Sequence, residues 1–287
     1  MQLLNALRTK GIRPAWRYAP GGILWRVFPS HPDVLVGEER DIDRKQAGFF
    51  CLARETGHVL WEKRSFDEQW WIGIESVGRD VVFLHCFAKP DMPGHKGIIA
   101  LDLRSGEELW RNDDLTLDKV FATTILASRV TMTGSEQMAL HARSGERSEG
   151  TEADNGEGAS PIAEVEMNFP EEADPLRDEH PELSAMREHL PPRELLAGPL
   201  EFVNLQSLLV MGFHERLVPA QSTLPRFRHT VLVGDKVSGR ILFRDTIASD
   251  STGIVPDSFF VQDGMLFFVK ERTALIAVNL KDRIRGA

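Results

Sequence analysis

Copies of one glycine-centred segment predict an all-β fold, a β-propeller of five four-stranded blades closed by an N-terminal strand. In four copies an aromatic residue follows a leucine and stands four positions after the glycine: Gly21 to Trp25, Gly57 to Trp61, Gly106 to Trp110 and Gly239 to Phe243. A degenerate copy ends at Gly145. Short apolar runs accompany the copies, roughly four in each unit of about 36 to 50 residues, which is the length of a propeller blade.

Each copy has the pattern of a strand, a tight turn and a returning strand. Ile99, Leu101 and Leu103 alternate with Ala100 and Asp102, which is the period of a strand with one buried face. A Ser-Gly or Thr-Gly pair then supplies a residue that accepts positive φ at the turn. The Leu-Trp pair opens the returning strand, and we expect its indole to wedge against the neighbouring unit.

The repeats divide one domain of residues 1–287 into five blades. The expected ranges are 31–64, 67–112, 118–149, 199–247, and 252–280 together with the N-terminal strand. We expect residues 23–28 to pair with residues 274–280, because this closure removes the free edges of an open array. In the alternative, residues 14–19 take that place and residues 23–28 form the innermost strand of the first blade. A sixth blade would need a sheet through residues 162–169.

The repeat lapses in residues 144–198, which we interpret as an acidic, partly disordered insertion with a short helix. Residues 146–188 hold fourteen acidic and three basic residues, which leaves 29 acidic and 31 basic residues elsewhere. Residues 145–160 have few large apolar side chains, so we expect a mobile loop there. Residues 181–190 predict a helix with three apolar residues on one face, Leu183, Met186 and Leu190. A helix packed on the domain wall is favoured over a lid or docking arm.

Composition indicates a cytoplasmic protein. Residues 1–11 lack the apolar run of a signal peptide, and no later segment is long and apolar enough to cross a bilayer. Cys51 and Cys86 are too few for a disulfide framework and their spacing fits no zinc motif, so we expect two free thiols in a reducing compartment. No basic patch with interleaved aromatic residues indicates nucleic-acid binding.

The first candidate binding residues are Glu39, Arg40 and Asp41, which follow an apolar strand from Val34 to Val36. Carboxylates that a strand delivers to a propeller face can act as acid and base or hold a cation. The simpler interpretation, which we favour, is a charged outer loop in which arginines offset the carboxylates.

The second candidate group is His85, Lys89 and His95, which flank or lie in a Pro-rich loop whose ends a hairpin brings close together. With Cys86 the two histidines are zinc-ligand types. Successive strand residues point to opposite faces, however, so His85 and Cys86 do not easily reach one metal. We therefore expect no metal and no cofactor, and we favour a rigid connecting turn over a polar-lined pocket loop.

The third candidate group is the adjacent pair Trp70 and Trp71. In a strand, one indole of such a pair faces away from whatever buries the other, and an exposed indole can stack on a sugar or a peptide. Packing between blades is the simpler interpretation.

The run from Ala100 to Trp110, Ala-Leu-Asp-Leu-Arg-Ser-Gly-Glu-Glu-Leu-Trp, closely resembles the repeat of pyrroloquinoline-quinone-type propellers. That superfamily also contains scaffolds without a cofactor, such as outer-membrane assembly lipoproteins. The chain is also similar to a bacterial propeller family of unknown function, a resemblance that implies no activity. The quinoprotein enzymes have more blades, an adjacent cysteine pair and a calcium site, so the resemblance here implies the fold and not the quinone chemistry.

The absence of familiar catalytic motifs points to a non-enzymatic binding or protein-interaction propeller, with an unidentified protein or small molecule as its partner. The alternative is a five-bladed hydrolase or lyase that acts on a carbohydrate or lactone through axial carboxylates. Residues that would then lie at inner strand ends are Glu39, Asp41, Asp118 and His85. Two carboxylates converging on one solvent-filled pocket would favour the enzyme, since fold alone does not decide function.

Overall fold

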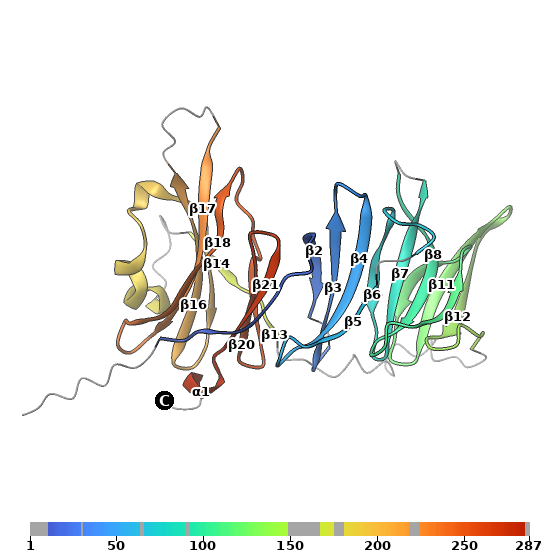
Figure 1. The fold of residues 1–287 in the computed structure, drawn as a ribbon, viewed down its shortest axis with the longest axis horizontal. Coiled ribbons are helices and arrows are strands. Elements are labelled where there is room, and N and C mark those ends of the chain that lie inside the picture. The colour runs from blue at the N-terminus through green and yellow to red at the C-terminus, as the bar shows by residue number, and fades with distance from the viewer. Residues whose placement is uncertain are drawn as a thin grey trace, which may run out of the picture. The chain divides into compact units, whose positions relative to one another are not determined.

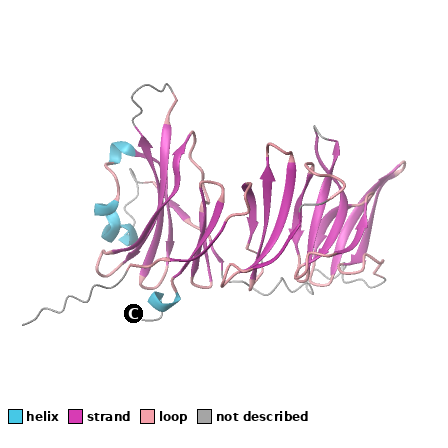
Figure 2. Ribbon diagram, in the orientation of Figure 1, coloured by secondary structure: helices cyan, strands magenta, loops and turns pink. Residues whose placement is uncertain are grey.

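The computed structural model describes residues 11–29, 31–63, 66–89, 92–148, 167–174, 181–217 and 224–284. Within them the fold is all-β, with antiparallel strands and a few short helical turns (Figures 1 and 2). The chain divides into two compact units. Residues 20–165 form the three-sheet unit, and residues 1–19 with 166–287 form the two-sheet unit.

The three-sheet unit contains two four-stranded sheets and one three-stranded sheet, in the orders β2-β3-β4-β5, β6-β7-β8-β9 and β10-β11-β12. Their strands are β2 (Ile23–Phe28), β3 (Val34–Asp41), β4 (Gln46–Ala53), β5 (Val59–Lys63), β6 (Ile72–Val77), β7 (Val81–Lys89), β8 (Met92–Asp102), β9 (Glu108–Asn112), β10 (Thr116–Val120), β11 (Thr124–Thr131) and β12 (Gly134–His141). Consecutive strands pair within each sheet, because tight turns join them.

The two-sheet unit contains two five-stranded sheets, in the orders β14-β15-β16-β17-β18 and β1-β21-β20-β19-β13. Its elements are β1 (Pro14–Tyr18), β13 (Met167–Asn168), β14 (Glu171–Ala173), β15 (Leu196–Asn204), β16 (Leu208–Leu217), β17 (Arg226–Asp235), β18 (Ile241–Ser251), β19 (Phe259–Gln262), β20 (Met265–Lys270) and β21 (Ala274–Asn279), with the 3-10 helices η2 (Pro181–His189) and η3 (Arg193–Leu195) and the short helix α1 (Lys281–Ile284). The fifth strands, β13 and β14, come from the acidic segment.

The predicted wedge of the repeat indole is confirmed in the three-sheet unit. The Trp61 indole contacts the next sheet, where its Nε1 donates a hydrogen bond to the carbonyl of Leu103 at 2.9 Å. Trp110 repeats the contact with the carbonyl of Ala142 at 2.9 Å. The indole of Trp61 lies on Gly106, whose φ is +71° and whose position would bring a Cβ within 2.6 Å of the ring. Glycine is therefore required at this turn both by its dihedral angle and by the ring.

The expected pairing of residues 23–28 with residues 274–280 is wrong. Strand β1 pairs with β21, whereas β2 pairs with β3 as the first strand of its sheet, which is the alternative assignment. The Gly21 copy is consequently not equivalent to the others. A register shift between Leu24 and Arg26 places Trp25 on a bulge, where its side chain is 52% exposed, in contrast to 7% for Trp61.

The segment 181–190 forms a 3-10 helix, η2, rather than an α-helix, and it packs on the sheet as favoured above. Leu183 and Met186 are buried among apolar residues of β15, β16 and β17. The Met186 sulfur lies where a Cβ on Gly234 would stand, which brings the helix close to β17. Residues 149–166 and 175–180 lie outside the described residues, and with them most of the expected mobile loop.

The acidic segment does not add a separate sheet in the part of it that the structure describes. Met167 and Asn168 instead pair with Gln262 and Val261 in the last sheet. The apolar core lies between neighbouring sheets within each unit. In the described ranges, no helix is long and apolar enough to cross a membrane.

Candidate functional site: an aromatic and histidine cluster

Two β-bulges lie in the second sheet, and one of them carries the carboxylate of the candidate site. The register between β6 and β7 shifts at Glu75, between Ile74 and Ser76. The register between β7 and β8 also shifts between Leu84 and Cys86, but there the extra residue lies on β8, in the Gly97–Ile98 pair opposite His85. A bulge turns the side chain of the extra residue away from the regular pleat, which is why bulges recur beside functional sites.

His95 on β8 completes the group, and its ring stacks on that of His85. The ring centroids are 3.5 Å apart, with an interplanar angle of 17°. His95 Nδ1 lies 2.5 Å from Glu75 Oε2, and His85 Nε2 lies 3.9 Å from the same oxygen. One ligand atom from each of the three residues fits within 4.8 Å of the others. We call Glu75, His85, His95, Phe87 and Trp71 the aromatic–histidine cluster.

Two buried polar atoms of this cluster make no hydrogen bond to any described residue. They are His85 Nε2 and Glu75 Oε2. The approach of His95 Nδ1 to Glu75 Oε2 is an ion-pair contact without hydrogen-bond geometry. A buried polar atom without a partner costs about 1–3 kcal/mol, so native proteins keep few of them and often at sites that take a ligand, ion or water.

The His85 ring is uncharged at neutral pH, and a contact of its Nδ1 atom fixes its orientation. Burial, and secondly the charge on His95, lower the pKa of His85 to about 4. Its Nδ1 lies 3.3 Å from the carbonyl oxygen of Cys86. A proton on Nδ1 can be donated to that carbonyl, which leaves the lone pair on Nε2 facing the cluster.

Apolar rings flank the histidines on the outer side. Phe87 meets His85, His95 and Trp71 edge-on, with centroid distances of 5.1, 5.3 and 5.7 Å. The Trp71 side chain is 39% exposed, so the pair Trp70 and Trp71 does present one indole to solvent. Glu68 Oε1 accepts the backbone N–H groups of both tryptophans at 2.8 Å and holds this segment at the start of β6.

A buried ion pair supports the cluster from the first sheet. Glu38 is fully buried, pairs with Arg40 and accepts the backbone N–H of Ile74 at 3.0 Å. The Arg40 guanidinium donates to the carbonyls of Trp70 and Ile72, each at 2.6 Å, and lies 5.4 Å from the Trp70 ring. Arg40 therefore positions the segment that carries both tryptophans.

Of the other binding residues predicted from the sequence, Glu39 and Asp41 lie apart from the cluster. Glu39 accepts the backbone N–H of Gly22 at 2.9 Å and lines a pocket of about 130 Å³ with Asp41. Asp41 accepts the backbone N–H of Arg44 at 3.0 Å and pairs with its guanidinium. Lys89 ends strand β7, and its side chain lies outside the described part of the chain.

Sequence reasoning missed Glu75 and Phe87. Glu75 interrupts the apolar run from Ile72 to Val77, and an acidic residue within such a run was an available signal. The bulge that directs its side chain gave no signal in the sequence, because strand register depends on the partner strand.

The two-sheet unit holds a similar group whose polar atoms are satisfied. His214 and His229 stack with centroids 3.8 Å apart. The Ser258 hydroxyl lies 3.0 Å from Glu201 Oε2 and 3.2 Å from His229 Nε2, and the Asp257 N–H donates to Glu201 at 2.5 Å. Val255 N–H donates to His214 Nε2 at 3.3 Å. Because of these contacts we assign this group a structural role, which is to hold the loop before β19.

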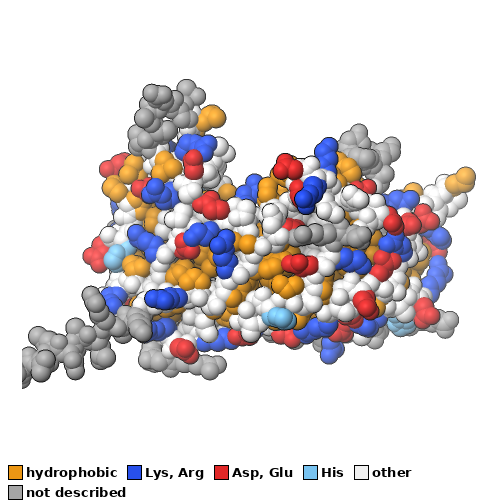
Figure 3. All heavy atoms as spheres, viewed as in Figure 1, with side chains coloured by type: hydrophobic (Ala, Val, Ile, Leu, Met, Phe, Trp, Pro, Cys, Tyr) orange, Lys and Arg blue, Asp and Glu red, His pale blue; other side chains and the backbone are white. Residues whose placement is uncertain are grey.

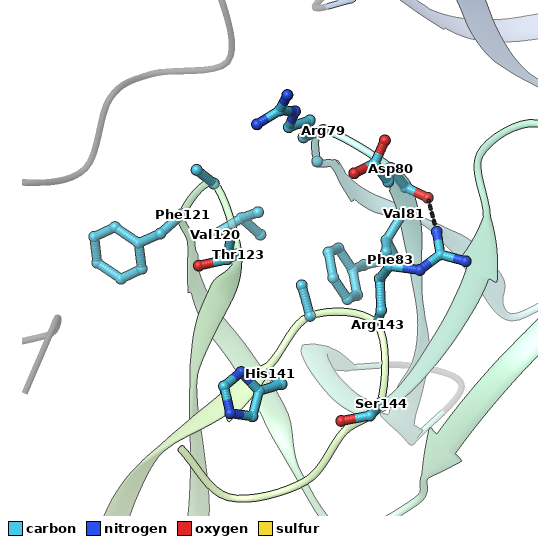
Figure 4. A pocket seen from close by; sticks show the side chains of 13 residues that line it. Arg79, Asp80, Val81, Phe83, Val120, Phe121, Thr123, His141, Arg143 and Ser144 are labelled. Carbon is cyan, nitrogen blue, oxygen red and sulfur yellow. Dashed lines mark hydrogen bonds between the residues drawn. The ribbon is translucent and has the colours of Figure 1, made fainter. Parts of the chain in front are cut away.

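A separate pocket of about 210 Å³ lies where the β6–β7 and β10–β11 turns meet in the three-sheet unit (Figure 4). Arg143 donates to the carbonyl of Asp80 at 3.5 Å and to Asp102 at 3.0 Å. No buried polar side-chain atom among its described lining residues lacks a partner. The repeat turns form this pocket, and we regard it as a weaker candidate for a ligand site than the aromatic–histidine cluster.

A family model described as a domain of unknown function, DUF4905, matches residues 29–110, a range that contains the whole cluster. No curated protein matches the chain. Among solved structures, BamB from Moraxella catarrhalis is 12% identical, with 93% of this chain and 86% of that chain covered and a TM-score of 0.34. The uncharacterized protein lmo1340 from Listeria monocytogenes EGD-e is 10% identical, covering 91% and 84%, with a TM-score of 0.31. An exo-1,5-alpha-L-arabinanase from a bovine ruminal metagenomic library is 10% identical, covering 88% and 89%, with a TM-score of 0.23.

Proposed function

We propose that this chain is a non-enzymatic binding protein and that the aromatic–histidine cluster is its ligand site. The observation that carries the proposal is that several residues predicted from the sequence lie together. His85, His95 and Trp71, singled out from the sequence, meet in one half-buried group where His85 Nε2 and Glu75 Oε2 make no hydrogen bond. Arg40 and Trp70 lie directly behind it. Convergent polar groups beside exposed aromatic rings are what a ligand site needs.

The carboxylates that a hydrolase mechanism would use are each engaged elsewhere. Glu39 accepts a backbone N–H and Asp41 caps its own turn. Asp118, in a different sheet, accepts hydrogen bonds from Ser128 at 2.9 Å and Gln137 at 3.2 Å. Catalysis by a carboxylate pair requires both groups to reach one substrate bond, so this arrangement favours binding over hydrolysis.

The charge distribution favours a small ligand or a protein over nucleic acid. On the visible face of the three-sheet unit, basic and acidic side chains are interspersed (Figure 3). Nucleic-acid binding depends on a continuous basic surface that neutralises several phosphates.

We also propose that the five described sheets are the blades of one closed propeller. The indole contacts that link successive sheets at Trp61 and Trp110 support this, as does β1, which joins the N-terminal segment to the last sheet. Small-angle scattering tests it. A closed domain of this length has a radius of gyration of about 19 Å, and a clearly larger value would contradict closure.

A ligand panel tests the proposed binding function. The full chain is heated with divalent metal chlorides, monosaccharides, amino acids and nucleotides in turn, and the melting temperature is recorded. At least one class should raise it in the wild type, and less so in Trp71→Ala or His95→Ala. The exposed substitution Trp25→Ala is the matched control. Release of nitrophenol from nitrophenyl glycosides or of acid from lactones, abolished by Glu39→Gln, would instead establish the enzyme.

A further inference from the structure

We propose that Glu75, His85 and His95 bind one divalent transition-metal ion of the zinc type. The inference rests on the proposed function and names the ligand class of that site. Two imidazole nitrogens and one carboxylate oxygen are a donor set suited to Zn²⁺ and its first-row neighbours. It departs from the sequence expectation of no metal, which had considered Cys86 as the third ligand in place of Glu75.

The spacing of the donor atoms is close to what such an ion needs. The three atoms lie within 4.8 Å of one another, and within the described residues this is the group of three that meets that condition. Donors of a tetrahedral zinc ion at about 2.0–2.1 Å lie roughly 3.3 Å apart. Small side-chain rotations therefore bring them to the ion, since Glu75 and His95 are partly exposed.

The unpartnered His85 nitrogen is the observation that points to an ion. His85 is 3% exposed and its Nε2 faces the cluster without a hydrogen bond. The other ring nitrogen faces the Cys86 carbonyl at 3.3 Å. A metal-bound histidine commonly has this second contact, because it fixes the tautomer and aims the ligating nitrogen.

The backbone leaves room for the ring in this position. A Cβ at Gly73, directly opposite His85 across the ladder, would stand 3.0 Å from His85 Nε2. The regular pairing of His85 with Gly73 sets the ring beside that glycine, and the bulge at Glu75 brings the carboxylate to 3.9 Å from His85 Nε2. Cys86 is excluded as a ligand, since it follows His85 and points to the opposite face.

The second histidine group is an internal comparison. It has the same residue types, two stacked histidines and one glutamate, but the Ser258 hydroxyl and two backbone N–H groups occupy their free atoms. Stacked histidines alone therefore do not mark a site in this chain. Three protein ligands at the Glu75 group leave a fourth position for water or for a donor atom of a bound partner, as in open zinc sites.

The experiment uses the purified full chain, stripped with a chelator and titrated with ZnCl₂ in a calorimeter and with CoCl₂ in a spectrophotometer. We expect one ion per chain and visible cobalt bands without an intense thiolate-to-metal band. His95→Ala and Glu75→Gln should each weaken zinc binding at least about tenfold. His58→Ala, which removes a histidine outside the cluster, should leave it unchanged.

Two outcomes would overturn the metal site: a wild-type chain that binds no zinc, or variants that bind it as tightly as the wild type. Circular dichroism identifies any variant that fails to fold, and the cobalt spectrum of the wild type then decides alone. If zinc does not bind but a sugar, amino acid or nucleotide does so in a Trp71-dependent way, the metal inference fails and the proposed binding function stands. If no class of ligand binds, both fail.

Discussion

Substitution of Trp61 by alanine tests the structural unit of the repeat most directly. The indole is 7% exposed, lies on the Gly106 turn of the next sheet and donates its N–H to the carbonyl of Leu103. Removing it leaves a cavity between two sheets and takes the side-chain donor from that carbonyl. Both effects act on the same contact between sheets.

The expected loss in the free energy of unfolding is about 3–6 kcal/mol. Truncation of a buried tryptophan or phenylalanine to alanine costs about 3–5 kcal/mol, and loss of the hydrogen bond adds up to about 1 kcal/mol. Trp25→Ala is the matched control, since it alters the same Leu-Trp motif at a side chain that is 52% exposed. We expect that control to cost less than about 1 kcal/mol.

Urea unfolding followed by circular dichroism measures both variants. Trp61→Phe separates the two contributions, because it keeps an aromatic ring and removes only the N–H donor and part of the volume. Equal losses for Trp61→Ala and Trp25→Ala would refute the assignment of the indole as the link between sheets.

Three further predictions follow from buried polar groups. Burial lowers the pKa of His229 to about 3, so the unfolded chain takes up a proton below pH 6.5 that the folded chain excludes. The free energy of unfolding should therefore fall by about 2 kcal/mol at this residue between pH 7 and pH 5; in a pH series of urea titrations His229→Gln should remove this share of the slope and leave the shares of His85 and His214. Arg40→Met should cost about 3–5 kcal/mol in the same assay, because it leaves Glu38 buried without its cation. Gly73→Ala should weaken zinc binding in the calorimeter, because its Cβ meets the ring nitrogen of His85.

Each of these three predictions has a control or a contradicting outcome. An unchanged slope between pH 7 and pH 5 in His229→Gln would show that other groups cause the acid sensitivity. Arg44→Met should be nearly neutral, since the Arg44 side chain is 79% exposed, and a loss equal to that of Arg40→Met would contradict the buried ion pair. Zinc affinity that survives Gly73→Ala would place the ion away from His85.

Local sequence patterns predicted the strand and turn of each repeat well. The turn glycines Gly57, Gly106 and Gly239 have φ values of +68°, +71° and +72°, which few other residues adopt without strain. Gly145, taken as a degenerate copy, has the same φ of +71° and bears the ring of Trp110. These features depend on a few adjacent residues, so the sequence alone contains them.

The same patterns misassigned the two N-terminal strands. Gly21 and Trp25 satisfy the motif, yet β2 pairs with β3 and β1 takes the place beside β21. Both segments are short and partly apolar, so neither composition nor period distinguishes them. Strand pairing is a long-range choice that depends on which edge each segment can cover.

The candidate site was predicted in part. The sequence singled out His85 and His95 as chemically interesting, because histidines flanking a hairpin loop are brought together by its antiparallel strands. The third member, Glu75, required knowledge of register, since the bulge in β6 turns its carboxylate toward the His85 ring.

The amino-acid sequence by itself determined the all-β class, the repeated turn and the indole that follows it, because these are consequences of dihedral preference and of a two-residue period. The tertiary structure decided which strands share a sheet, which carboxylates accept hydrogen bonds from backbone N–H groups and which buried polar atoms make no hydrogen bond. Those properties depend on atoms far apart in the chain, and a buried atom is satisfied or unsatisfied only once its neighbours are in place.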